Sequence, residues 1–158
     1  MCEFDPQCDG ADDLVGDAIA QIVDGRWAVT GVLGDAAHPP LAYTTGLTEH
    51  GRPELLMTGL PPRLAGLLLD HAAQSVALDA TFGPGSQVPA RLRRPVSLRA
   101  IDVIDAGPMR LTRVIFGQQF EAVQLVWPDD EGRYPWQRGY AIPAQVQPLL
   151  GLPVAEAA

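Results

Sequence analysis

Hydrophobic positions near the start of the chain recur with helical spacing and then with strand spacing. From Asp12 to Gly25, apolar residues fall at i, i+1, i+4, i+5, i+8 and i+9, which predicts a helix with one buried face. The members of this face are Leu14, Val15, Ala18, Ile19, Ile22 and Val23. The pattern then becomes β-branched and partly alternating, with turn residues between the runs. It predicts three strands, at residues 26–34, 41–47 and 54–60.

A second helix is predicted after Pro61 and Pro62, because a missing N–H costs nothing in the first helical turn. From Arg63 to about Ala77, apolar and small residues form one stripe, which indicates a largely buried helix. The residues of this stripe are Leu64, Leu67, Leu68, His71, Ala72 and Ser75.

The second half of the chain alternates between strand patterns and Gly- or Pro-rich turns. The expected elements are a loop at 82–89, one or two strands at 90–105 broken at Pro95, a short helix ending at Gly117, a strand at 121–129, a turn at 128–136, and a Pro-punctuated tail from 140. In the strand at 121–129, the alternation sends Gln124 to one face and Trp127 to the other.

Helix and strand do not alternate strictly, and short turns join the strands. This order favours an α+β domain with two main helices and a mostly antiparallel sheet or half-open barrel. We expect residues 1–11 to form a flexible leader that contains Cys2 and Cys8, residues 12–151 to form a single domain, and residues 152–158 to be a frayed tail.

The composition narrows the classes of partner. The chain has 158 residues and a net charge of −8. This acidity argues against general binding to nucleic acids or anionic membranes. No segment approaches the roughly 20 apolar residues of a membrane span, and the N-terminus lacks the pattern of a signal peptide. We therefore expect a cytoplasmic protein. All 11 basic residues are Arg, which excludes chemistry that depends on a Schiff-base lysine.

Signals for metal binding and nucleophilic catalysis are weak. No two histidines are spaced at i, i+4, and no zinc signature is present, so no metal site is expected. Cys2, Cys8 and His71 are the weak candidates for a metal or redox role. The sequence contains no GxSxG motif around any of its serines.

Two segments could contribute to a ligand site. Four arginines fall within nine residues, at Arg91, Arg93, Arg94 and Arg99, and could receive a phosphate or carboxylate. The alternative, which the acidic composition favours, is that they pair with the chain's own acids across neighbouring strands. The segment WPDDEGRYPW could line a groove or could only fasten a turn to the core.

Three blocks of sequence resemble one family. They are GRWAVTGVLGDAAHPPLAYTTGLTEHGRPELLMTGLP, FEAVQLVWPDDEGRYPWQRGY and QPLLG. Together they resemble the bacterial domain-of-unknown-function family numbered 4262. Matching positions include Trp27, Tyr43, Thr44, Gly46, Glu54, Gly59, Gln124, Trp127, Pro128, Asp129, Trp136, Gln147 and Pro148. The chain departs from the family pattern at Arg26, where the family often has Gly, and at Leu41, where it often has Phe. Its two cysteines, Cys2 and Cys8, are also farther apart than the CxxC pair that is common in the family. The resemblance implies no activity.

We expect a small ligand-binding or accessory domain without its own catalysis, which could take a small anionic ligand. The candidate ligand-binding residues are Tyr43, Thr44, Thr45, Glu54, Arg93, Arg94, Gln124, Trp127, Asp129 and Trp136. A second hypothesis is a split-barrel-like enzyme that binds a flavin or another anionic cofactor, because the front half resembles flavin-reductase-like barrels. Flavin mononucleotide would then contact Thr44, Thr45, Arg93 and Arg94, with Trp127 or Trp136 over its ring. A third is a metal or redox role through Cys2 and Cys8. The protein is expected to be a monomer, or a homodimer through a sheet edge or the aromatic turn.

Overall fold

The computed structural model of the chain describes residues 10–155, with side chains from Leu14 onward. Its helices are α1 (Gly10–Val23), α2 (Pro62–Val76), α3 (Arg110–Phe116) and the short 3-10 helix η1 (Leu47–His50). Its strands are β1 (Ala28–Val32), β2 (Leu41–Thr45), β3 (Glu54–Thr58), β4 (Gln87–Arg91), β5 (Pro95–Val103), β6 (Ala122–Val126) and β7 (Gly151–Leu152).

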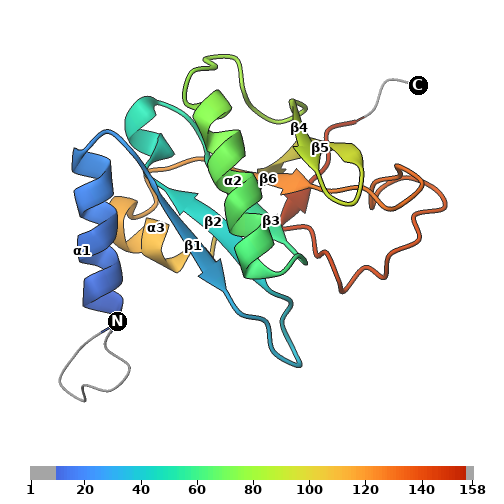
Figure 1. Cartoon of the computed structure of the whole chain (residues 1–158), viewed down its shortest axis with the longest axis horizontal. Helices are drawn as coiled ribbons and strands as arrows, with labels where there is room; N and C mark the ends of the chain where they lie inside the picture. The colour runs from blue at the N-terminus through green and yellow to red at the C-terminus, as the bar shows by residue number, and fades with distance from the viewer. Residues whose placement is uncertain (1–9, 156–158) are drawn as a thin grey trace.

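The strands form one open sheet in the order β1-β2-β3-β6-β5-β4 (Figure 1). Strands β3 and β6 pair in parallel, and every other pairing in this sheet is antiparallel. The short β7 pairs with the far end of β5, at Asp102 and Val103, beyond the part of β5 that pairs with β4. The predicted α+β class with a mostly antiparallel sheet is confirmed, and the sheet does not close into a barrel.

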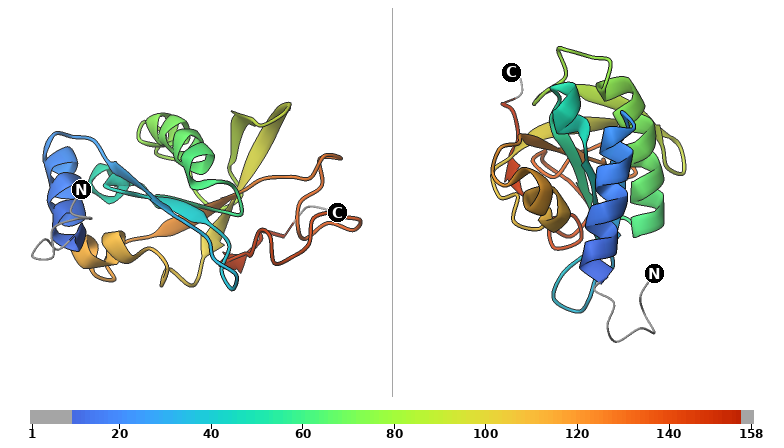
Figure 2. Two further views of the ribbon diagram at one scale, coloured as in Figure 1. Left: turned by 60° about the horizontal axis from the view of Figure 1, so that its bottom comes forward. Right: turned by 90° about the vertical axis from the view of Figure 1, so that its left-hand side faces the viewer.

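Helices cover both faces of the sheet (Figure 2). Helix α2 packs across β1, β2 and β3, and its cluster of buried residues includes Leu55, Leu69 and Leu125. Helices α1 and α3 lie against the opposite face, where Tyr43 and Leu56 are buried. Because both faces are covered, all five residues of β6 are buried and its side chains alternate between the two sides.

The predicted buried stripe of α2 is only partly right: Ala72 is buried and Leu68 packs against the core, but the buried face is rotated from the prediction. Residues that face the sheet are Ala65, Leu69, Ala72, Ala73 and Val76. By contrast, Leu67, His71 and Ser75 are exposed. Small alanines let the helix lie close to the sheet, whereas the run of leucines around the helix left the periodicity ambiguous.

Smaller differences concern boundaries. The predicted loop at 82–89 already contains the start of β4 at Gln87, and the short helix η1 occupies part of the connection between the predicted strands at 41–47 and 54–60. Strand β7 crosses the expected end of the domain at residue 151. Cys2 and Cys8 lie outside the described residues. Among the helices of residues 10–155, none combines the length and apolar character needed to cross a membrane.

Candidate functional site

Glu54, at the start of β3, is a buried carboxylate that organises its neighbouring turn. Its side chain is 0% exposed. It accepts hydrogen bonds from the Thr44 hydroxyl at 2.8 Å, from the backbone N–H groups of Gly46, Leu47 and Thr48 at 3.0, 3.1 and 2.9 Å, and from the Thr48 hydroxyl. The start of η1 therefore wraps around this carboxylate, whose acceptor positions are used within the protein.

Tyr43 and Thr45 fasten β2 to α3. The Tyr43 hydroxyl accepts a hydrogen bond from the backbone N–H of Leu111 at 3.0 Å. Burial raises the pKa of the Tyr43 phenol above its ordinary value of 10.0, which keeps it neutral. The Thr112 hydroxyl donates to the carbonyl of Thr44 at 3.0 Å, so the Thr45 hydroxyl, 2.8 Å away, donates to Thr112. These polar side chains connect elements to one another.

Gln124 and Gln147 hold the C-terminal segment against β6. The amide of Gln124 donates to the Thr58 hydroxyl and to the carbonyl of Pro148, and its oxygen accepts from the N–H of Leu150 at 2.8 Å. Gln147 bonds both the N–H and the carbonyl of Trp127, at 3.0 and 2.9 Å. The Gln147 amide thus satisfies the backbone of Trp127, just after β6, and the Gln124 amide binds the chain at Pro148 and Leu150.

A groove of about 800 Å³ opens on the α2 side of the sheet. It lies between the first turn of α2, the tip of the β4–β5 hairpin and the segment that follows β6. Its volume is in the range of small-molecule sites. Of the candidates from the sequence, Arg93, Arg94, Trp127 and Asp129 line this groove together. Tyr43, Thr44, Thr45, Glu54, Gln124 and Trp136 do not line it.

The hairpin tip provides a basic rim for the groove. Strand β4 ends at Arg91 and β5 begins at its partner Pro95, so residues 92–94 form the turn. Arg91, Arg93 and Arg94 are exposed. Within residues 10–155, none of the three forms an ion pair, and the expectation that they pair with the chain's own acids is wrong. Arg99 lies opposite Gln87 in the hairpin and faces a different cavity.

The segment that follows β6 brings acidic residues to the same groove, and Asp129 organises this segment. Both oxygens of Asp129 accept backbone hydrogen bonds, from Glu131 and Arg133 on one oxygen and from Ala141 on the other, each at 2.9 Å. Burial acts to raise the pKa of Asp129, but these backbone donors outweigh it and hold the pKa below its ordinary value of 3.8. Asp129 therefore closes the loop, whereas the neighbouring Asp130 and Glu131 are exposed at the groove.

The floor of the groove is apolar. It is formed by Leu60, Leu64, Leu92, Val96, Trp127 and Ile142. The indole N–H of Trp127 donates to the carbonyl of Thr58 at 2.9 Å. This bond fixes the ring, so Trp127 offers the groove an immobile aromatic surface and no free donor.

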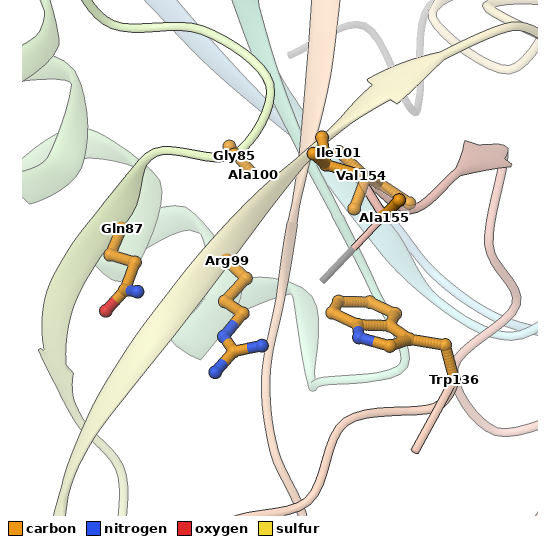
Figure 3. Close-up of a pocket in the computed structure, with 8 residues that line it drawn as sticks. All are labelled: Gly85, Gln87, Arg99, Ala100, Ile101, Trp136, Val154 and Ala155. Carbon is orange, nitrogen blue, oxygen red and sulfur yellow. The ribbon is translucent and has the colours of Figure 1, made fainter. Parts of the chain in front are cut away.

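A smaller cavity of about 380 Å³ lies on the other side of the hairpin. Figure 3 shows the side chains of Gln87, Arg99 and Trp136 around it. The guanidinium of Arg99 lies over the Tyr134 ring at 4.2 Å, and Tyr134 stacks on Trp136 with centroids 5.4 Å apart. These contacts fasten the segment after β6 to the sheet. Trp136 lines this smaller cavity and Trp127 lines the groove, so the two tryptophans face separate cavities.

The remaining candidate from the sequence, His71, lies away from both cavities. His71 is exposed on α2. Across residues 10–155, no three His, Cys, Asp or Glu side chains are grouped closely enough to hold a metal ion. Several groove residues were not candidates from the sequence, among them Leu60, Leu64 and Ile142. In the sequence, Leu60 is an apolar residue after a strand, Leu64 one at the start of a helix, and Ile142 one in a Pro-rich tail. Many core residues look the same, so nothing marked these three as part of a site.

Comparisons with known proteins give a family and no further relative. The sequence model of one family, described as Domain of unknown function (DUF4262), matches residues 21–141. Neither the curated proteins nor the solved structures gave a match. The match covers most of the chain and includes the Glu54 turn, the hairpin and the Trp127–Glu131 wall, as the sequence motifs had indicated. The chain belongs to the family described as a domain of unknown function, DUF4262.

Proposed function

We propose that this domain binds a small amphipathic anion in the groove between α2, the β4–β5 hairpin and the Trp127–Glu131 segment. The ligand class is an apolar or aromatic body that carries a carboxylate, sulfonate or phosphate. The observation that carries the proposal is the basic rim of Arg91, Arg93 and Arg94, which faces an apolar floor and has no ion pair within the described residues.

Charge supports an anionic ligand. The chain has a net charge of −8, with 19 acidic residues available to only 11 arginines. Arg91, Arg93 and Arg94 nevertheless line one groove together, which concentrates positive charge at a single place in an acidic chain. A guanidinium recognises carboxylate and phosphate oxygens through paired N–H donors, which suits it to this role.

The floor supports the amphipathic part of the proposal. Leu60, Leu92 and Ile142 provide aliphatic surface, and the fixed ring of Trp127 provides a flat one. Burying the apolar body of a ligand here would make the binding free energy more favourable by about 25 cal/mol for each Å² of apolar surface removed from water. The arginines would add charge-assisted contacts to this apolar contribution and would also orient the ligand.

The lining favours binding over nucleophilic catalysis. Among the described residues that line the groove there is no histidine, serine, threonine or cysteine. The ionisable groups at hand are the three arginines, Asp130 and Glu131, together with Asp129, whose oxygens already accept three backbone hydrogen bonds.

Flavin mononucleotide is one member of this ligand class, since it carries a phosphate on an aromatic body. The site that the sequence suggested for it combined Thr44 and Thr45 with Arg93 and Arg94. Both threonines are 0% exposed and hydrogen-bonded within the protein, away from the groove. A flavin that binds here would use the arginine rim and Trp127 instead.

Isothermal titration calorimetry with 8-anilinonaphthalene-1-sulfonate and with flavin mononucleotide tests the proposal. We expect saturable binding of at least the sulfonate, with a Kd that rises about tenfold or more in the variant Arg93→Gln/Arg94→Gln, because two charge-assisted contacts are lost. Added salt should weaken binding, since the rim is exposed.

Arg138→Gln is the matched control, because Arg138 is an exposed arginine outside the groove. It should bind as the unchanged protein does. Leu92→Gln should weaken binding of the sulfonate without changing the charge of the rim. Absence of binding, or affinities that the Arg93→Gln/Arg94→Gln variant leaves unchanged, would contradict the proposal.

A further inference from the structure

Strand β1 leaves one edge of the sheet open. It stands at the end of the strand order and pairs only with β2, and within residues 10–155 no strand pairs with its outer side. Figure 1 shows β1 at this border of the sheet. An unpaired strand edge presents backbone N–H and C=O groups that can join another strand.

A shallow groove runs beside this edge, between β1 and α2. It has a volume of about 560 Å³ and is lined by Trp27, Val29, Gly31, Gly66, Leu67 and others. Gly31 lets the helix lie close to the edge strand, because a Cβ at Gly31 would be 2.9 Å from Pro62. Leu67 on α2 is 66% exposed, and Leu33, directly after β1, is 84% exposed. The edge thus combines open backbone groups with uncovered apolar side chains.

The charges beside the groove are self-complementary. Arg63 and Asp70 both line it, on either side of Leu67 along α2. They are seven residues apart, so they lie on one face of the helix about 10 Å from each other along its axis. A two-fold axis beside Leu67 would place Arg63 of one copy opposite Asp70 of the other, and the reverse. Within the described residues neither side chain forms an ion pair, although Asp70 accepts hydrogen bonds from the Trp27 indole at 3.2 Å and from the Gln74 amide at 3.5 Å.

We infer that this face binds a second copy of the chain. Strand β1 pairs in antiparallel fashion with β1 of the other copy, and the two sheets become one. The helices α2 then lie side by side across the axis, with the two Leu67 side chains filling the space between them and two Arg63–Asp70 pairs flanking them. This interface lies apart from the ligand groove, since the two share no lining residue.

Sedimentation velocity of the full chain over a range of concentrations tests this inference. We expect a dimer of twice 16.9 kDa. Leu67→Gln and Arg63→Asp should each weaken the dimer by about tenfold or more, because each change acts twice across the axis. Combining Arg63→Asp with Asp70→Arg reverses both charges and should restore most of the affinity.

Arg138→Asp makes the same change of charge at an exposed site outside this groove and should leave the dimer intact. Circular dichroism confirms that each variant is folded. A protein that is monomeric at every concentration would overturn the inference. So would a dimer that neither Leu67→Gln nor Arg63→Asp weakens, or a charge exchange that remains as weak as Arg63→Asp alone.

Discussion

Replacing Glu54 by Gln tests whether this side chain is a structural centre. The substitution keeps the size of the side chain but places an NH₂ group where one carboxylate oxygen stood. One oxygen accepts from Gly46 and from both donors of Thr48, and the other accepts from the Thr44 hydroxyl and the Leu47 N–H. The NH₂ group will take the second position, where fewer donors are displaced.

The magnitude follows from these contacts. In the better orientation the backbone N–H of Leu47, which is buried, faces another donor, and an unsatisfied buried donor costs about 1–3 kcal/mol. The contacts to Gly46 and Thr48 become neutral hydrogen bonds, which are about half as strong as those to a carboxylate. Together these losses give a destabilisation of about 3 kcal/mol, or a decrease in Tm of about 6–12 °C for a domain of this size.

Thermal unfolding followed by circular dichroism measures this effect. Glu49→Gln is the control, because Glu49 is exposed in the same short helix η1. It should change Tm by no more than about 1–2 °C. If Glu54→Gln unfolds at the same temperature as Glu49→Gln, then the carboxylate does not hold the turn and our reasoning about it is wrong.

Other parts of the account make separate predictions. The lowered pKa of Asp129 means that its ionised form stabilises the fold above its ordinary value of pH 3.8 and that this contribution is lost as the pH falls further towards the folded value; acid should therefore lower the Tm of Asp129→Asn less steeply than that of the unchanged protein, and parallel curves would argue against this. Gly59→Ala should cost about 3 kcal/mol in chemical unfolding, because φ is +89° and the new Cβ would be 2.4 Å from the carbonyl of Val146. Gly51→Ala, with φ +70° in open space, should cost only about 1 kcal/mol, and equal costs would refute the steric argument. Gln124→Leu removes the hydrogen bonds that hold the C-terminal segment, so amide exchange at Leu150 should accelerate about tenfold or more; an unchanged rate would show that the segment is held by other contacts.

Much of the sheet could be predicted from the sequence. Strands β2, β3 and β6 stand out as short, mostly apolar runs between turns, because both faces of the sheet are covered and these strands are buried along almost their whole length. The parallel pairing of β3 with β6 could not be read in the same way, since it joins segments more than 60 residues apart. The buried face of α2 was misassigned because leucines surround the helix and the deciding alanines carry little periodic signal.

The candidate site was only partly predictable, because the sequence does not show which buried polar side chains bind the protein's own backbone. Glu54 and Gln124 became candidates because they are polar residues at positions that match the family motifs. Their partners are backbone groups of the η1 turn and of the C-terminal segment, which a sequence pattern does not reveal. Trp127 and Trp136 are close in sequence, but they line different cavities. The arginine cluster was the signal that did lead to the groove.

Chemical-shift mapping by nuclear magnetic resonance tests the central claim most directly. The chain has three tryptophans, whose indole N–H signals report three separate places: the α2 edge for Trp27, the groove for Trp127 and the second cavity for Trp136. On titration with 8-anilinonaphthalene-1-sulfonate, we expect the Trp127 indole and the backbone amides of residues 91–94 to shift and saturate together, while the other two indoles remain in place. Shifts confined to Trp136 and Arg99, or to Trp27, would contradict the account.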